Sequence, residues 1–328
     1  MINRRTFIQS AAALGTGAGV LQVMGQNSTG QKNQNKAKAQ KQGRKWKIAF
    51  LDSLGYSSMK PAEVVKSLSK LGYEGIEWTT RHIDINNPLP GLRELADRTH
   101  DAGMVVSRLS TLEDMVCLND EERRKRIERT VRIIEAAGQC GIGNVGTMPG
   151  PFAWRASAPK IGKNISESAA WEMVFEAHEA FGKAAKAAGV VISSEAVFGM
   201  VAHDFYTHKF MMDHLDASVN KVNHDPSHGI LYGNLDVGWV IRQWGDRIAH
   251  VHLKDAVGIP ERGKFIFPLL GEGLVDWKAF FKALDDIGYE GFCSVEYESF
   301  AYYQKVLKSN PEEAARISLE QVKALTKM

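Results

Sequence analysis

Cysteine is scarce in this chain, and its few cysteines form no pattern. Cys117, Cys140 and Cys293 are an odd number, at spacings that do not suit a metal site. Two of them lie in segments that we expect to be buried. These observations argue against a disulfide framework, although an exported protein could carry one, and against a metal site built on thiolates.

The chain also lacks a long apolar run and a glycine-rich turn for a dinucleotide. Its apolar stretch, residues 11–24, is too short and too rich in glycine for a membrane span, so we expect no stable span in the mature protein. No Gly-x-Gly-x-x-Gly motif follows the first predicted strand. This absence disfavours a doubly wound open sheet, the main alternative among α/β folds.

An excess of positive charge is missing from most of the chain. Of the 41 lysines and arginines, eight lie within residues 1–45 and 33 lie beyond residue 45. All 38 acidic residues also lie beyond residue 45. The formal charge of +3 therefore belongs to the N-terminus, and the remainder is mildly acidic. Proteins that bind nucleic acid present a basic face, so we expect no nucleic-acid partner.

The N-terminus has the layout of an export signal. Asn-Arg-Arg-Thr-Phe-Ile-Gln, residues 3–9, precedes the apolar stretch and resembles the twin-arginine signal of bacteria. No cysteine follows the stretch, which argues against a lipoprotein. We expect residues 1–25 to be the signal and residues 26–45, rich in Gln, Asn, Lys and Gly, to be a disordered linker. The twin-arginine export machinery would then be a partner, and the protein would be periplasmic or otherwise exported.

From residue 46 onward, short apolar runs alternate with longer amphipathic stretches. The predicted strands are 46–52, 75–78, 104–109, 143–147, 190–195, 221–225, 248–254 and 292–297. The predicted helices are 61–71, 91–102, 120–140, 167–188, 207–215, 237–244, 277–287 and 311–327. Eight strand–helix units in about 280 residues are typical of a (β/α)8 barrel, an α/β fold, so we expect residues 46–328 to form a single TIM-barrel domain.

Acidic and imidazole side chains follow four neighbouring predicted strands. Glu195, Asp225, His252 and Glu296 each lie at or just past a strand end, where a parallel barrel brings side chains to one rim. Carboxylates that converge there lose water and repel one another unless a cation compensates. Two Glu, one Asp and a His therefore predict a site for one divalent ion. Carboxylate and imidazole ligands suit Mn²⁺, Mg²⁺, Co²⁺ or Zn²⁺.

The chain resembles a known family, the xylose isomerase-like barrel superfamily. The resemblance is carried by Glu195 and by Gly-Tyr-Glu-Gly-Ile-Glu (72–77), Asp-Pro-Ser-His (225–228), His-Val-His-Leu-Lys-Asp (250–255), Gly-Glu-Gly-Leu-Val-Asp-Trp (271–277) and Gly-Tyr-Glu-Gly-Phe-Cys-Ser-Val-Glu (288–296). That superfamily includes sugar isomerases and epimerases, inosose dehydratases and, more distantly, endonuclease IV. These motifs are specific for the superfamily and only weakly specific for the substrate.

The resemblance implies roles for individual residues. The metal ligands would be Glu195, Asp225, His252 and Glu296, with Mn²⁺ as the expected ion. Glu195 and Glu296 would also be the catalytic acid–base pair, which moves a proton from one face of a metal-stabilised enediolate to the other. His228 would contact the substrate.

Three further residues are predicted to bind the substrate. Lys254 would hold a substrate oxygen, or else form a salt bridge with Asp255. Glu77 would bind a hydroxyl, or else cap its strand. His250 is also assigned to the substrate, with an orienting role one layer deeper in the barrel as the alternative.

The predicted activity is that of a divalent-metal-dependent isomerase or epimerase of an unphosphorylated sugar or keto-sugar. The chain lacks the arginine that ketohexose epimerases have a few residues after His252, which leaves the sugar open. A lyase or dehydratase begins with the same proton abstraction and is the main alternative. An endonuclease IV-like phosphodiesterase needs more early histidines than the chain has, and a non-catalytic sugar-binding barrel needs no pair of facing carboxylates. The sequence leaves a homo-oligomer open.

Overall fold

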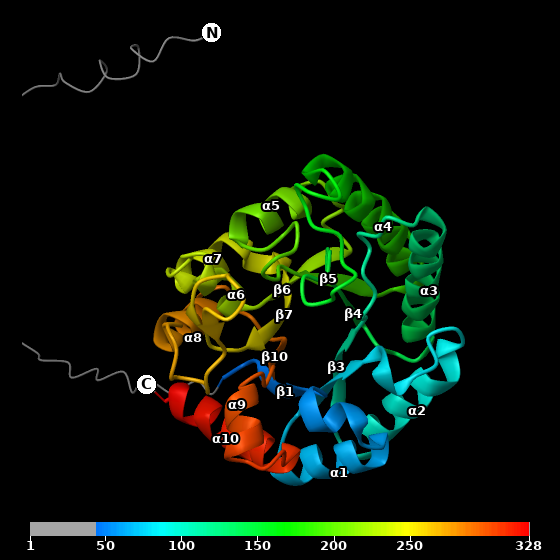
Figure 1. Ribbon diagram of the computed structural model, residues 1–328. Helices are drawn as coiled ribbons and strands as arrows, with labels where there is room; N and C mark the ends of the chain where they lie inside the picture. The colour runs from blue at the N-terminus through cyan, green and yellow to red at the C-terminus, as the bar shows by residue number, and fades with distance from the viewer. Residues whose placement is uncertain (1–43, 328) are drawn as a thin grey trace, which may run out of the picture. The chain divides into compact units, whose positions relative to one another are not determined.

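Eight short parallel strands close into a barrel, and each buries its backbone by pairing on both sides. The computed structural model describes residues 44–327, and its barrel order is β1-β10-β7-β6-β5-β4-β3-β2 (Figure 1). The strands are β1 (Lys47–Leu51), β2 (Gly75–Thr79), β3 (Val105–Ser110), β4 (Asn144–Thr147), β5 (Val191–Glu195), β6 (Asn220–His224), β7 (Ile248–Leu253) and β10 (Phe292–Val295). The closed barrel confirms the fold prediction and excludes the open sheet.

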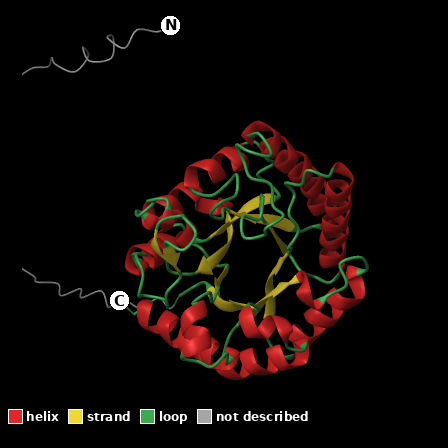
Figure 2. Cartoon of the chain, viewed as in Figure 1, coloured by secondary structure: helices red, strands yellow, loops and turns green. Residues whose placement is uncertain are grey.

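Helices surround the barrel and cover the apolar outer faces of its strands (Figure 2). They are α1 (Pro61–Leu71), α2 (Pro88–Asp101), α3 (Asp120–Gln139), α4 (Glu167–Ala188), α5 (Phe205–Asp213), α6 (Pro226–Leu231), α7 (Val237–Trp244), α8 (Trp277–Asp286), α9 (Phe300–Lys305) and α10 (Pro311–Leu325). Short 3-10 turns lie at Leu54–Ser58 (η1), Thr80–His82 (η2) and Gly245–Arg247 (η3). The predicted bounds of α1, α4 and α7 are confirmed.

Several elements differ from the prediction for local reasons. Helix α5 begins two residues early because Asp204 caps it, accepting a hydrogen bond from the Thr207 backbone N–H at 2.8 Å. Helix α6 was not predicted, and it begins directly after Asp225, which accepts from Ser227 N. The segment after β7 holds a small antiparallel pair, β8 (Val257–Gly258) and β9 (Phe265–Ile266).

The predicted signal segment and nearly all of the predicted linker lie outside the described residues. Between residues 44 and 327, no helix combines the length and the apolar composition that crossing a membrane requires.

Buried neutral histidines between the strands and the helices make stability depend on pH. Burial lowers the pKa of His178 to about 4, and its ring contacts Thr147 Oγ1 at 3.1 Å and Val174 O at 2.9 Å. The unfolded chain binds protons near pH 6.5, so the stabilisation is complete above that pH and is lost as the pH falls toward 4. We expect His178→Gln to reduce the pH slope of the unfolding free energy by about 1.4 kcal/mol per pH unit.

Urea unfolding at several pH values between 4.5 and 7 measures this slope. His100→Gln, at an exposed position on α2, is the matched control and should leave the slope unchanged. An unaltered slope in His178→Gln would show that this histidine titrates alike in both states.

Candidate metal centre at the barrel rim

The structure brings the four predicted metal ligands together. Glu195 ends β5, Asp225 follows β6, His252 lies in β7 and Glu296 follows β10, and these four strands are neighbours in the barrel. One potential ligand atom from each lies within 4.8 Å of all the others. We call these four residues the rim cluster. Their arrangement matches the prediction that consecutive strands deliver them to one rim.

The donor atoms of the rim cluster suit a divalent cation. His252 Nδ1 lies 3.0 Å from Glu296 Oε2, 3.4 Å from Glu195 Oε2 and 3.9 Å from Asp225 Oδ2. Asp225 Oδ1 accepts from Ser227 N at 2.8 Å, which fixes the carboxylate and turns Oδ2 toward the cluster. That Oδ2 is buried and accepts no well-formed hydrogen bond. Three carboxylates and one imidazole nitrogen are a hard, oxygen-rich donor set of the kind that Mn²⁺, Mg²⁺ or Zn²⁺ accepts.

A second buried group lies below the rim cluster and shares His252. Glu77 is fully buried and accepts from Arg108 Nη1 at 2.6 Å, from Ser110 Oγ at 2.7 Å and from His252 Nε2 at 3.0 Å. The carboxylate therefore holds the Nε2 side of His252 and leaves Nδ1 to face the cluster. Glu77 was predicted to bind a substrate hydroxyl; its buried carboxylate holds three protein partners in this structure, and the substrate contact stays a prediction.

His250 lies one layer deeper in the barrel than the rim cluster, which is the position expected for the orienting role. It is fully buried, and its Nδ1 is 2.9 Å from Asn223 Oδ1. Asn223 Nδ2 in turn donates to Glu195 Oε2 at 2.9 Å. His250 thus reaches Glu195 through one amide, which suits the orienting role, and the substrate contact stays a prediction.

His228 and Lys254 lie beside the rim cluster. His228 Nε2 lies 3.6 Å from Glu195 Oε1, 3.5 Å from Asp225 Oδ2 and 3.3 Å from Lys254 Nζ. The ammonium of Lys254 contacts Glu296 Oε2 at 2.6 Å and Asp225 Oδ2 at 2.9 Å. The ion pair with Asp255 that was the alternative for Lys254 does not form.

Asp255 instead organises the long loop that follows β7. Its carboxylate accepts from the backbone of Ala256, Gly271, Gly273 and Val275 and from Trp277 Nε1, at 2.9 to 3.1 Å. A Cβ at Gly273 would lie 2.1 Å from Asp255 Oδ1, so only glycine fits this close approach. The motif at residues 271–277 is therefore explained by the carboxylate that it surrounds.

Aromatic side chains of this loop pack over the rim. The Phe267 ring lies 4.8 Å from Lys254 Nζ and 5.8 Å from the His228 ring. Phe265 and Phe267 also contact Phe198, which follows β5. The loop after β7 thereby covers His228 and Lys254 with an apolar layer, and this layer lowers the local dielectric around the charges.

The pKa values in the rim cluster follow from burial set against neighbouring charge. Burial would raise the pKa of Glu195, but His252, His228 and Lys254 outweigh it and hold that pKa well below its usual range. The same balance, with Lys254 and His252 dominant, lowers the pKa of Glu296 to about 2. Burial raises the pKa of Asp225. Two of the three carboxylates are thus held ionised, as ligands must be.

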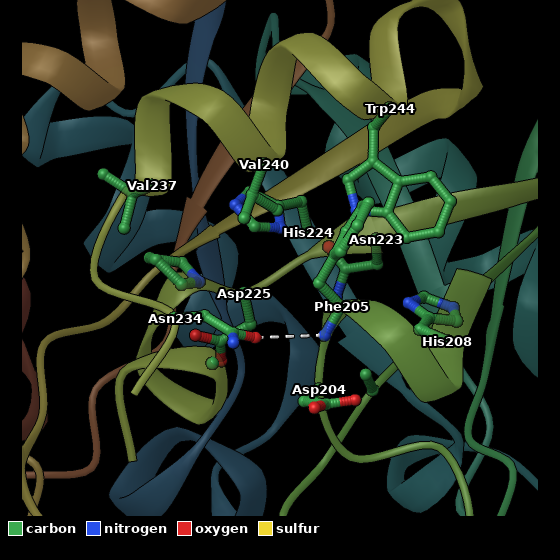
Figure 3. A pocket seen from close by; sticks show the side chains of 13 residues that line it. Asp204, Phe205, His208, Asn223, His224, Asp225, Asn234, Val237, Val240 and Trp244 are labelled. Atoms are coloured by element: carbon green, nitrogen blue, oxygen red, sulfur yellow. Dashed lines mark hydrogen bonds between the residues drawn. The ribbon is translucent and has the colours of Figure 1, made fainter. Parts of the chain in front are cut away.

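A cavity on the helix side of the cluster meets it at Asp225. Figure 3 draws this cavity between α5, α6 and α7, and its lining includes Asn223, His224 and Asp225 together with His208 and Trp244. Its lining is partly polar, and the buried Nε2 of His224 has no hydrogen-bond partner there. The packing of α5 to α7 therefore bears on the orientation of Asp225.

Comparison with curated proteins finds inosose dehydratases as relatives. An inosose dehydratase from Clostridium perfringens is 28% identical over 180 residues, which cover 51% of this chain and 59% of that protein. One from Lacticaseibacillus casei is 27% identical over 161 residues, 44% of this chain and 51% of that protein. The chain thus matches somewhat more than half the length of these curated relatives.

Solved structures share the fold at low identity. The apo 3-keto-D-glucoside 4-epimerase from E. coli has a TM-score of 0.67 at 17% identity, covering 86% of this chain and all of that one. A zinc-bound IolI protein has a TM-score of 0.67 at 18% identity, covering 85% and 97%. The family model described as xylose isomerase-like TIM barrel matches residues 65–325. The chain therefore belongs to the xylose isomerase-like TIM barrel family.

Proposed function

We propose that this protein is a divalent-metal-dependent isomerase or epimerase of an unphosphorylated sugar or keto-sugar. The observation that carries the proposal is the rim cluster, whose four potential ligand atoms lie within 4.8 Å of one another at the mouth of the barrel. Glu195, Asp225, His252 and Glu296 would hold the ion. Mn²⁺ is our first choice, with Mg²⁺, Co²⁺ and Zn²⁺ as alternatives, and the zinc in the IolI protein supports a metal of this class.

The residues around the cluster supply the proton chemistry. When bound, the ion would act as a Lewis acid toward a carbonyl and an adjacent hydroxyl, which acidifies the C–H between them. Glu195 and Glu296 come from β5 and β10, which β6 and β7 separate, so the two carboxylates approach a bound sugar from different sides. One would remove the proton and the other would return it. His228 and Lys254 would bind sugar oxygens at the rim.

The ion pairs of the cluster support a substrate without phosphate. In the described part of the chain, the permanent cation in these pairs is Lys254, and it already contacts the carboxylates of Asp225 and Glu296. A phosphate group would require an unpaired cationic site.

A dehydratase is the second candidate, and the curated relatives named inosose dehydratases favour it. β-Elimination starts with the same proton abstraction and differs in the loss of water from the next carbon. The residues that would remove the proton are therefore the same in both reactions.

NMR of candidate keto-sugars in D₂O, after incubation with Mn²⁺-loaded protein and removal of the ion by chelation, tests both candidates. Deuterium at one carbon without loss of water supports epimerisation or isomerisation. An unsaturated product supports the dehydratase. Absence of exchange across ketohexoses, 3-keto-glucosides and inososes would contradict proton-transfer chemistry.

Export is part of the proposal and has a separate test. We expect residues 1–45 to direct a fused reporter out of the cytoplasm through the twin-arginine machinery, because Arg4 and Arg5 precede the apolar stretch. Replacing both arginines with lysine should abolish export, while Lys36→Gln in the same fusion should not. Export of the double variant at the original level would contradict the signal.

A further inference from the structure

Lys254 places a positive charge inside the rim cluster. Its side chain is 3% exposed, and its ammonium lies 2.6 Å from Glu296 Oε2 and 2.9 Å from Asp225 Oδ2. A lysine so well removed from water is stable only where carboxylates surround it. The ammonium is therefore the counter-ion of two residues that would also be metal ligands.

The oxygens that Lys254 contacts are those that face His252. Glu296 Oε2 lies 3.0 Å, and Asp225 Oδ2 lies 3.9 Å, from His252 Nδ1. An ion held by His252 and these carboxylates would use the same two oxygens as the ammonium. Two cations so close repel strongly in a buried site, so both cannot keep the same contacts.

Glu298 offers the ammonium a contact outside the rim cluster. Its Oε2 lies 3.3 Å from Lys254 Nζ, and its side chain is 27% exposed, more than that of any cluster carboxylate. Glu296 and Glu298 both reach Lys254 Nζ from the segment that follows β10. Glu298 is therefore placed to keep Lys254 paired while leaving Asp225 and Glu296 to an ion.

We propose that Lys254 and the divalent ion compete for Asp225 and Glu296, and that Glu298 receives the ammonium when the ion binds. This inference rests on the proposed metal site and deepens it. The displaced ammonium stays near His228 Nε2, now 3.3 Å away, and near the face of Phe267. There it presents a positive charge to a sugar oxygen beside the ion. The substrate class that gains most is a keto-sugar, whose carbonyl oxygen becomes negative when the adjacent proton leaves.

Calorimetric titration of Mn²⁺ into the chelator-treated full-length protein, without any sugar, tests the competition. We expect Lys254→Met to tighten Mn²⁺ binding about tenfold or more, because removal of a neighbouring positive charge favours the ion. The metal-free variant should also melt at a lower temperature than the wild type, and Mn²⁺ should restore its Tm. Lys264→Met, which removes an exposed lysine of the β8–β9 hairpin, is the control and should change neither quantity.

Glu298→Gln is a second test variant, and it keeps the Lys254 ammonium as the counter-ion of the rim cluster. We expect it to weaken Mn²⁺ binding several-fold, because the ammonium loses its alternative partner, and to leave the metal-free Tm close to that of the wild type. Equal or weaker Mn²⁺ binding by Lys254→Met, beside a wild type that binds, would overturn this inference alone. Unchanged binding by Glu298→Gln would overturn the role of Glu298. Absence of binding by the wild type and by Lys254→Met would overturn the proposed metal site as well.

Discussion

Glu195→Gln is expected to slow deuterium exchange into the substrate by about 10³-fold, within the range that general acid–base groups contribute. The amide has nearly the shape of the carboxylate and can still accept from Asn223 Nδ2, which contacts Glu195 Oε2 at 2.9 Å. It cannot take up a proton, and it is a poorer ligand for a divalent ion. The measurement is the rate of exchange at the carbon next to the carbonyl, at saturating Mn²⁺.

The metal content of the variant separates the two roles of Glu195. If the variant binds Mn²⁺ but does not catalyse exchange, Glu195 transfers the proton. If it binds no Mn²⁺, the loss of exchange is explained first by the loss of the ion. Glu261→Gln, at an exposed position paired with Lys264 on the hairpin after β7, should leave exchange within about twofold. Exchange that stays within tenfold of the wild type in Mn²⁺-loaded Glu195→Gln would contradict the assigned role.

The barrel could be predicted because its signals are local and repeat. Glycines with positive φ end α1 at Gly72 and α4 at Gly189, and the strands between helices are short apolar runs. The rim cluster could be located because every member lies at or just past a strand end. Parallel closure then brings strands that are distant in sequence into one neighbourhood.

The layer below the rim was harder to predict because its partners come from opposite sides of the barrel. Arg108 in β3 was not singled out beside the histidines of β7, yet it contacts Glu77 of β2 and Ser193 of β5. Alternation places Arg108 and Ser110 on one face of β3, which is the signal that could have found them. A shift of register between Ile76 and Glu77 is a tertiary feature that sequence spacing does not carry.

The Lys254–Asp255 ion pair, the alternative predicted for Lys254, does not form for a similar reason. Adjacent residues on a strand point to opposite faces, so a pair of opposite charges in sequence need not be an ion pair. Lys254 faces the barrel mouth and meets carboxylates from β6 and β10, while Asp255 turns toward the loop at residues 271–277. Which face each takes depends on where β7 ends, and strand ends are the least certain part of a sequence-based prediction.

Arg108→Met is expected to destabilise the protein by about 3–5 kcal/mol, because it leaves the Glu77 carboxylate charged and buried without its guanidinium. Arg108 is 2% exposed, and its guanidinium also donates to Ser193 O at 3.0 Å. The guanidinium of Arg108 packs tightly against Gly146, since a Cβ at position 146 would lie 2.3 Å from Arg108 Cζ. Urea unfolding measures the loss.

The double variant Arg108→Met with Glu77→Gln distinguishes the buried charge from simple loss of packing. It should recover part of the lost stability, because the amide introduced at position 77 carries no charge that needs a cation, although His252 then loses the carboxylate that faces its Nε2. Arg98→Met on α2, where Arg98 pairs with Glu94 at an exposed position, is the control and should cost under about 0.5 kcal/mol. A loss below about 1 kcal/mol in Arg108→Met would mean that the histidines His250 and His252 already compensate Glu77 without the arginine.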